Sequence, residues 1–270
     1  MAAEQGVVCQ TMPIRLREGH SRLADWSAYL AALSIPVLII AAIGHRVRLL
    51  DAVPTYAVLA LGFSLAALAV IAAVAAFAAI WRDGRTGAGP ATRGLVFGLA
   101  ILTLPAIGAW KVVVYPRLND ISTDLVNPPA LSFAILDRGP SDEPVGALAD
   151  DEIAVHKDAY PDIVSRHYPV STARVYQEAK AIVDSRGWQV LSAREPSEED
   201  ETGMIEAVAV TTIFAFRQDV AIRILADGDG SLVDMRSAAR NAAHDLGADA
   251  ERVRRFFAEL DQKLQGISGV

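Results

Sequence analysis

Cysteine is nearly absent from this chain of 270 residues and histidine is rare, with one cysteine and five histidines. The lone thiol, Cys9, precedes the first apolar segment, so the rest of the chain can form no internal disulfide. His156 and His167 share no helical spacing with another histidine or cysteine that would suit a zinc site. His244 stands beside Asp245, but adjacent side chains rarely face each other, and no serine or cysteine lies in a nucleophile-elbow sequence. The sequence therefore predicts no catalytic residues, no metal site and no cofactor.

Positive charge is scarce in the second half of the chain. Residues 1–115 carry nine Lys or Arg against five Asp or Glu, whereas residues 116–270 carry sixteen against twenty-seven. Phosphate backbones are bound by clustered Lys and Arg, and a domain with this acidic excess repels them. The charge balance therefore excludes nucleic acid as a partner.

Three long segments lack Asp, Glu and His altogether, at about residues 26–44, 54–81 and 94–115. A helix needs about 20 apolar residues to cross about 30 Å of hydrocarbon, and each segment is close to that length or longer. Lys111 is their single charged residue, and its long stem can carry the amine to the interface. Because ion paths and proton relays usually need ionisable groups within the membrane, transport is disfavoured. The sequence predicts an all-α anchor of three transmembrane helices, with the lipid bilayer as its partner.

Basic residues near the segment ends predict the orientation of this anchor, because Lys and Arg are retained on the cytoplasmic side. One side has six, Arg15, Arg17, Arg22, Arg82, Arg85 and Arg93, and the other has four, Arg46, Arg48, Lys111 and Arg117. We therefore expect a multi-pass protein of the cell inner membrane, with residues 1–25 as a cytoplasmic tail and the second half in the periplasm. Gly94 and Gly98 form a GxxxG pair, which indicates close helix packing within the chain or between copies in a homo-oligomer.

Prolines recur through residues 116–170 and predict an irregular arm, because proline interrupts helices and central strands. Within this arm, residues 138–152 are acidic and poor in large apolar side chains. That composition predicts a mobile loop.

Residues 171–270 show the periodicity of an α+β domain. A helix is expected to begin at Ser171 or Thr172 and to end at Gly187, with Val175, Ala179, Ile182 and Val183 on one apolar face. Four antiparallel strands follow, at about 188–193, 204–211, 219–226 and 231–237, and then a helix at about 249–264. The soluble domain is thus predicted as helix, four-stranded antiparallel sheet, helix.

The turn Asp227–Gly230 fixes the register of the last two strands. It pairs Ile222 with Met235 on one face of the sheet and Arg223 with Asp234 on the other. Both helices need the apolar face, so the opposite face is expected to be polar and open to solvent or a ligand.

The second half resembles a known family. The resemblance rests on Leu118–Asp124 followed by Asn127-Pro128-Pro129, on Tyr160–Ile163, and on Asp234–Arg240 leading to Asp245–Asp249 and Arg252. These segments are similar to bacterial membrane proteins that carry the domain of unknown function 1499, and the similarity covers most of residues 116–265. The three-helix anchor also looks like that of many alphaproteobacterial members. Members often have Asn where this chain has Asp249, and either residue can cap the final helix. The family implies the architecture and no reaction.

Nine polar residues are candidate ligand-binding residues, Asn119, Asp120, Thr123, Asp124, Arg223, Asp234, Arg236, Arg240 and Asp245. Those at 119–124 also suit turns and caps, because short polar side chains bind neighbouring backbone groups. One interpretation is that an anion binds to Asp234, Arg236 and Arg240. The alternative is that these residues pair with others on a sheet face of mixed charge, namely Glu206, Arg223 or Asp219.

Two classes of function follow from these residues. The first is a non-enzymatic envelope module that binds a partner protein, lipid or small ligand at the membrane surface. The alternative is a hydrolase or other enzyme that uses Asp120, Asp124 or Asp245. It requires the fold to bring these carboxylates together with an arginine in an enclosed pocket.

Overall fold

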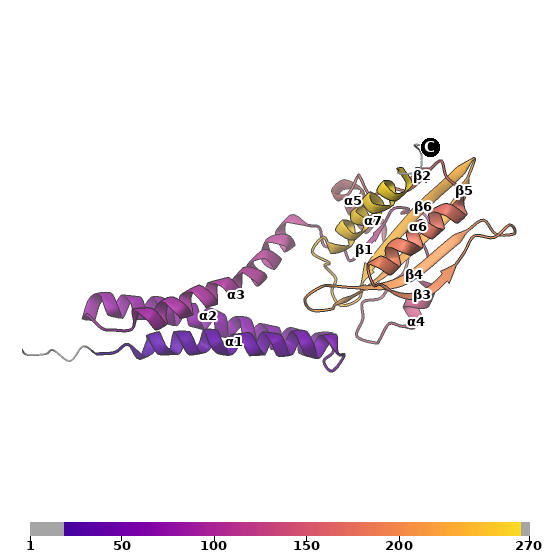
Figure 1. The fold of residues 1–270 in the computed structure, drawn as a ribbon. Helices are drawn as coiled ribbons and strands as arrows, with labels where there is room; N and C mark the ends of the chain where they lie inside the picture. The colour runs from indigo at the N-terminus through magenta and orange to yellow at the C-terminus, as the bar shows by residue number, and fades with distance from the viewer. Residues whose placement is uncertain (1–18, 266–270) are drawn as a thin grey trace, which may run out of the picture. The chain divides into compact units, whose positions relative to one another are not determined.

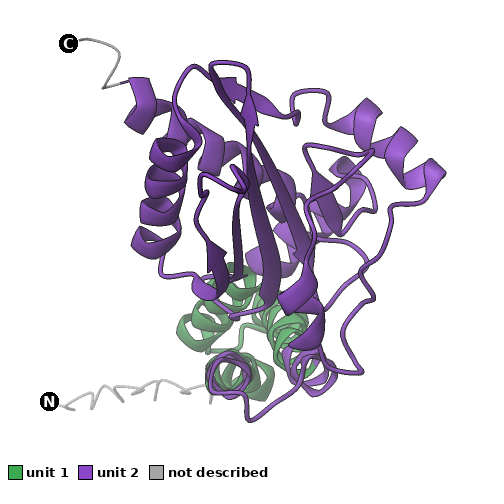
Figure 2. Cartoon of the chain, turned by 90° about the vertical axis from the view of Figure 1, so that its right-hand side faces the viewer, with its two compact units in different colours: residues 1–36, 61–102 green, residues 37–60, 103–270 purple. Residues whose placement is uncertain are grey.

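The structure is a computed structural model and describes residues 19–265. Cys9, Arg15 and Arg17 lie outside the described residues. The described chain forms two compact units, residues 19–36 with 61–102 and residues 37–60 with 103–265, which Figure 2 shows in different colours. We describe each unit by itself.

Three long helices open the described chain, α1 (Arg22–Arg46), α2 (Ala52–Asp83) and α3 (Ala88–Val114). They have 25, 32 and 27 residues, and each is long and apolar enough to cross a membrane. The prediction of three apolar helices is confirmed. Each helix starts before the predicted segment. The prediction was limited to the apolar residues, whereas the first turn of each helix also includes residues outside the apolar segment.

Small residues bring these helices together. A Cβ added at Gly94 would lie 2.6 Å from the backbone carbonyl carbon of Ser27, and one added at Gly98 would lie 2.7 Å from a methyl of Val70. The GxxxG pair of α3 therefore packs against α1 and α2 of the same chain. A homo-oligomer through the helices stays a prediction.

The domain that follows contains a six-stranded antiparallel sheet in the order β1-β6-β5-β4-β3, with β2 also paired to β6. Its strands are β1 (Asp120–Ser122), β2 (Arg166–Tyr168), β3 (Gln189–Arg194), β4 (Gly203–Val210), β5 (Arg217–Asp227) and β6 (Gly230–Ala239). The expected register is confirmed, since Ile222 faces Met235 and Arg223 faces Asp234. The helix, four strands and helix predicted for residues 171–270 are confirmed as α6, β3 to β6 and α7, and the sheet has two further strands that were not predicted. β1 and β2 come from residues 116–170, and three residues are too few to show an alternating pattern.

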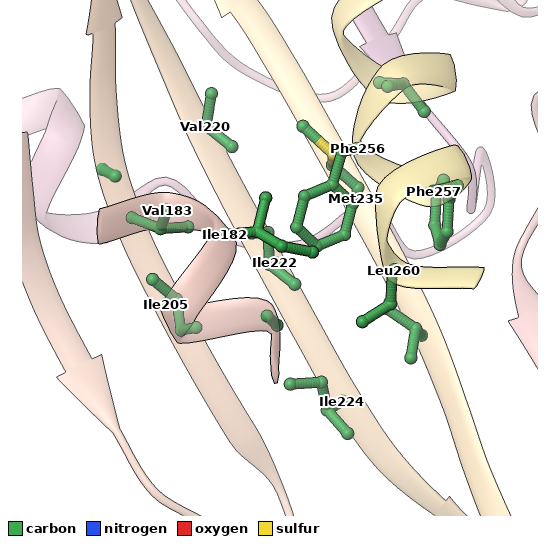
Figure 3. Close-up of a cluster of buried hydrophobic side chains, with 14 of the residues drawn as sticks. Ile182, Val183, Ile205, Val220, Ile222, Ile224, Met235, Phe256, Phe257 and Leu260 are labelled. Atoms are coloured by element: carbon green, nitrogen blue, oxygen red, sulfur yellow. The ribbon is translucent and has the colours of Figure 1, made fainter. Parts of the chain in front are cut away.

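Two helices cover one face of the sheet, α6 (Thr172–Ser185) and α7 (Ala248–Gln265), as Figure 1 shows. The predicted apolar positions of α6 are buried, and so are the apolar residues of α7, which are Val253, Phe256, Phe257, Leu260 and Leu264. They pack on the isoleucines, valines and Met235 of β4, β5 and β6, and Figure 3 shows this core. Each large side chain buried there contributes about 1.5–3 kcal/mol of transfer free energy.

The other face of the sheet is covered as well, so the prediction of an open polar face is wrong. Leu131 and Ala134 are buried against Ala221 and Ala238 of the sheet. Residues 116–170 are also more regular than expected. They contain β1, β2, α4 (Ser132–Leu136) and α5 (Asp150–Ala159), although residues 137–149 form no helix or strand.

Candidate functional site

Most of the predicted ligand-binding residues lie between the sheet and the covering arm, and they bind one another. Asp120 on β1 and Arg236 on β6 form a bidentate ion pair, with an Nε–Oδ1 distance of 2.9 Å and an Nη2–Oδ2 distance of 2.6 Å. Arg236 also donates to the carbonyl of Gly146, at 2.7 Å. The pair therefore joins the arm to the edge of the sheet.

A second group of charges surrounds Arg223. Its Nη2 lies 2.7 Å from Oδ2 of Asp234 and 2.9 Å from Oδ2 of Asp124. Thr123 and Ser165 donate their hydroxyls to the other oxygen of Asp234. Asp234 is fully buried, and these contacts account for its charge and for both of its oxygens.

A third group surrounds Asp219, which is also fully buried. Its Oδ1 accepts from Nε of Arg240 at 2.8 Å, and its Oδ2 accepts from Nε of Arg138 at 2.8 Å. Among residues 19–265 Glu206 has no cation as partner, and it instead accepts from the backbone amides of Phe133 and Ala134. The face of mixed charge thus satisfies itself, as one of the two interpretations of the sequence expected. The ligand role of these residues stays a prediction.

The remaining candidates lie at the start of α7 and beside β1. Asp245 is the cap of α7, because its carboxylate accepts from the amides of Gly247 at 2.9 Å and Asp249 at 2.6 Å. The backbone carbonyl of Asn119 accepts from Ala239 at 2.8 Å and prolongs the pairing of β1 with β6. His244 accepts from the amide of Leu246 through its ring, so its role is local.

Asp249 does not cap the final helix, contrary to expectation. It lies inside the first turn of α7, is fully buried, and binds the hydroxyl of Ser237 at 2.6 Å and Nη1 of Arg252 at 2.7 Å. Burial raises the pKa of Asp249 to about 7, against the opposing effect of Arg252. A buried carboxyl inside a helix start was not foreseeable from the sequence, because Asp at a helix start usually caps it.

A pocket of about 460 Å³ lies where two segments that carry the family resemblance meet. Thr123 and Asp124 line it from the chain after β1, and His156 and Tyr160 line it from α5 and its end. Leu125, Val126, Pro161, Ile163 and Val164 give it an apolar wall. Lys157 adds an exposed cation. The pocket therefore combines apolar surface with a few polar groups, as small-molecule sites usually do.

His156 has no polar partner at this pocket. It is 1% exposed, and neither ring nitrogen has a hydrogen-bond partner among the described residues. Burial lowers the pKa of His156, so the neutral ring is favoured, with one donor and one acceptor. An unsatisfied buried polar group costs about 1–3 kcal/mol, a cost that an apolar side chain would avoid.

Tyr160 stands one helical turn after His156 and shares this property. Its hydroxyl is buried without a hydrogen-bond partner in the described part of the chain. The two rings meet edge to face with their centroids 5.8 Å apart. Burial, assisted by the charge of Asp245, raises the pKa of Tyr160 to about 12, so it remains a donor. Two neighbouring side chains that line the pocket thus have buried polar atoms without hydrogen-bond partners among the described residues.

The sequence analysis missed His156 and Tyr160 as candidates. His156 was considered only as a metal ligand, and residues 19–265 contain no group of three His, Cys, Asp or Glu side chains that could hold a metal ion. The signal available in the sequence was the i,i+4 spacing of His156 and Tyr160, which places two side chains on the same face of a helix. The structure shows that this face of α5 is the buried one, since His156 is the buried residue of the helix.

Comparison with known sequences identifies the second half of the chain. The family described as "Protein of unknown function (DUF1499)" matches residues 120–260, from β1 into α7. No curated protein sequence matches the chain significantly. The matched region includes every residue that lines the pocket of His156, whereas the three apolar helices precede it.

Proposed function

The chain belongs to the DUF1499 family of proteins of unknown function, and we propose that its three apolar helices span a membrane and anchor the family domain as a non-enzymatic binding module. Each helix exceeds the roughly 20 residues that a span needs. The excess of Lys and Arg at the N-terminal end and in the α2–α3 loop supports a cytoplasmic N-terminus. Three crossings then carry the domain to the other side, the periplasm of a bacterial inner membrane.

The binding part of the proposal is carried by His156. A buried imidazole whose two nitrogens lack partners stabilises the fold less than leucine or phenylalanine would at the same position. It gains a hydrogen bond if a ligand enters the pocket of about 460 Å³ and the ring turns a nitrogen toward it. The apolar wall and Lys157 favour a small amphiphile, a molecule with an apolar chain and a carboxylate or phosphate group.

The carboxylate-dependent enzyme receives no support from the geometry. Asp120 is bound to Arg236, and Asp124 is bound to Arg223. Asp245 is engaged with backbone amides at the start of α7. Each carboxylate has a separate structural partner, whereas a general acid or base needs a free position beside its substrate.

The test of binding compares two histidine substitutions in the full chain, purified in mild detergent from its native membrane. We expect mass spectrometry to find an amphiphile with the wild-type protein and with His167→Phe, whose histidine is exposed and lies outside the pocket. We expect His156→Phe to lose it. Equal recovery from all three proteins, or recovery from none, would exclude this binding site.

The topology needs a separate measurement. Alkaline phosphatase fused to the C-terminus is active only if that end of the chain lies in the periplasm. Green fluorescent protein fused to the same end does not fluoresce after export by the general secretory route, so its fluorescence places that end in the cytoplasm. We expect phosphatase activity without fluorescence. The reverse result would place the domain in the cytoplasm and leave the binding proposal intact.

A further inference from the structure

The loop between β4 and β5, residues 211–216, is unusually apolar for a hairpin loop. Its sequence is Thr-Thr-Ile-Phe-Ala-Phe, whereas such loops are usually rich in Gly, Asn, Asp and Pro. Ile213 is 56% exposed, and Val210, directly before the loop, is 53% exposed. Two large aliphatic side chains therefore face outward at one end of the sheet.

The loop has a defined conformation that presents these side chains. The amide of Ala215 donates to the carbonyl of Thr211 at 3.0 Å, and the amide of Phe216 donates to the hydroxyl of Thr211 at 3.0 Å. Ala215 adopts a φ of +56°, which costs a non-glycine residue free energy. The hydrogen bonds close the loop at its base and leave Ile213 and Phe214 at its tip.

The base of this loop lies beside the chain that leaves α3. Val210, Thr211 and Thr212 line one pocket together with Lys111 and Tyr115. Tyr115 directly follows α3 and is packed against the domain core. The amine of Lys111 lies 5.9 Å from the centre of the Tyr115 ring. Lys and Tyr are residues that favour the headgroup layer at the end of a span.

We propose that the β4–β5 loop inserts Ile213 and Phe214 into the headgroup layer of the bilayer that α3 crosses. This inference rests on the proposed function, because it takes the end of α3 as the membrane surface. The bilayer is the occupant that the geometry favours, since the loop is adjacent to the point where the chain leaves the lipid. Insertion gives the domain a second membrane contact besides its covalent connection and so restricts its rotation.

The test uses a fluorescent label at the loop and a matched label at the far end of the same strand. Cys9, the only cysteine, is replaced by serine, and Ile213→Cys or Asp229→Cys is labelled with an environment-sensitive dye. Asp229 is exposed in the β5–β6 turn, at the other end of β5. The 11 residues of β5 span roughly 35 Å at about 3.3 Å per residue. The full chain is reconstituted into vesicles of phosphatidylethanolamine and phosphatidylglycerol and recovered by flotation.

We expect the label at position 213 to emit at shorter wavelength and to lose intensity when the vesicles contain lipids that carry a quencher on the upper acyl chain. The label at position 229 should keep its emission in water. Identical emission at both positions on floated vesicles would overturn the loop proposal and leave the membrane anchor standing. A shift at position 213 without quenching by lipid would also overturn it, because a protein contact would then cover the loop. Failure of the chain to float would overturn the anchor and the loop insertion together.

Discussion

Asp120 and Arg236 form a buried bidentate ion pair that joins the first strand of the arm to the last strand of the sheet. Their side chains are 12% and 5% exposed. Arg236 also donates to the carbonyls of Pro129 and Gly146, so one guanidinium holds the arm at three positions. The covering of the polar face therefore depends on a contact between residues more than 100 positions apart in the sequence.

Breaking this pair should destabilise the domain strongly. Asp120→Asn leaves the guanidinium buried without its counter-charge, and such a loss typically costs about 3–5 kcal/mol. We expect the double variant Asp120→Leu with Arg236→Met to recover much of that loss, because it buries no charge. Urea unfolding of the detergent-solubilised chain, followed by circular dichroism, measures both. A single variant that unfolds at the wild-type urea concentration would show that the pair contributes little.

The close contact of Gly94 with α1 predicts a position-specific effect within α3. Gly94→Ala places a methyl 2.6 Å from the backbone of Ser27, so the helices must separate, at a cost of about 1–3 kcal/mol. Gly108→Ala is the control, since nothing lies within 4 Å of its added methyl. The control should be neutral or gain up to about 1 kcal/mol of helix propensity. Thermal unfolding in detergent compares the two variants with the wild type. Equal melting temperatures for Gly94→Ala and Gly108→Ala would refute the close contact between Gly94 and α1.

His156→Phe should stabilise the ligand-free domain while it abolishes binding. The substitution removes two unsatisfied nitrogens, and the expected gain is about 1 kcal/mol. Because burial lowers the pKa of His156, the wild type should also lose stability as pH falls below about 6.5, where the unfolded histidine takes a proton that the folded one resists. The stability of His156→Phe should fall less over the same pH range. Urea unfolding at several pH values measures both effects, and a less stable variant would contradict the burial argument.

Asp249 predicts a pH dependence of the opposite sign. Its pKa is about 7 in the folded domain and about 3.9 in an unfolded chain, so between these values the folded state holds a proton that the unfolded state has lost. Its contribution to stability therefore falls as pH rises from about 4 to about 7. Asp249→Asn should remove this decline, whereas Asp229→Asn in the exposed β5–β6 turn should not. The difference between each variant and the wild type, measured from pH 4.5 to 8 by urea unfolding, isolates the effect. Parallel curves for Asp249→Asn and wild type would contradict it.

The elements that could be predicted from the sequence are those with a local periodic signal. Val175, Ala179, Ile182 and Val183 recur at helical spacing, and all four are fully buried in α6. The Asp227–Gly230 turn set the pairing of β5 with β6, which the structure confirms residue by residue. In both cases the residues that determine the element are close together in the chain.

The arm shows where this reasoning stops. Asp120–Ser122 and Arg166–Tyr168 are strands only because β6 offers them backbone partners, and neither has the length to show a pattern of its own. Leu131 and Ala134 cover the polar face through contacts with Ala221 and Ala238. The pocket of His156 escaped the sequence analysis for the same reason, because its walls come from segments about 30 residues apart.

The amino-acid sequence by itself determined the three apolar helices, the two amphipathic helices and the central hairpin of the domain, since hydrophobic spacing and turn chemistry act between near neighbours. Only the tertiary structure decided that the arm covers the charged face of the sheet. It also decided that the carboxylates of Asp120, Asp219 and Asp234 form ion pairs with arginines of the same domain. It alone showed that buried polar atoms of His156 and Tyr160 have no hydrogen-bond partner within residues 19–265. Burial and ion pairing depend on which distant side chains meet, and that is a property of the folded chain.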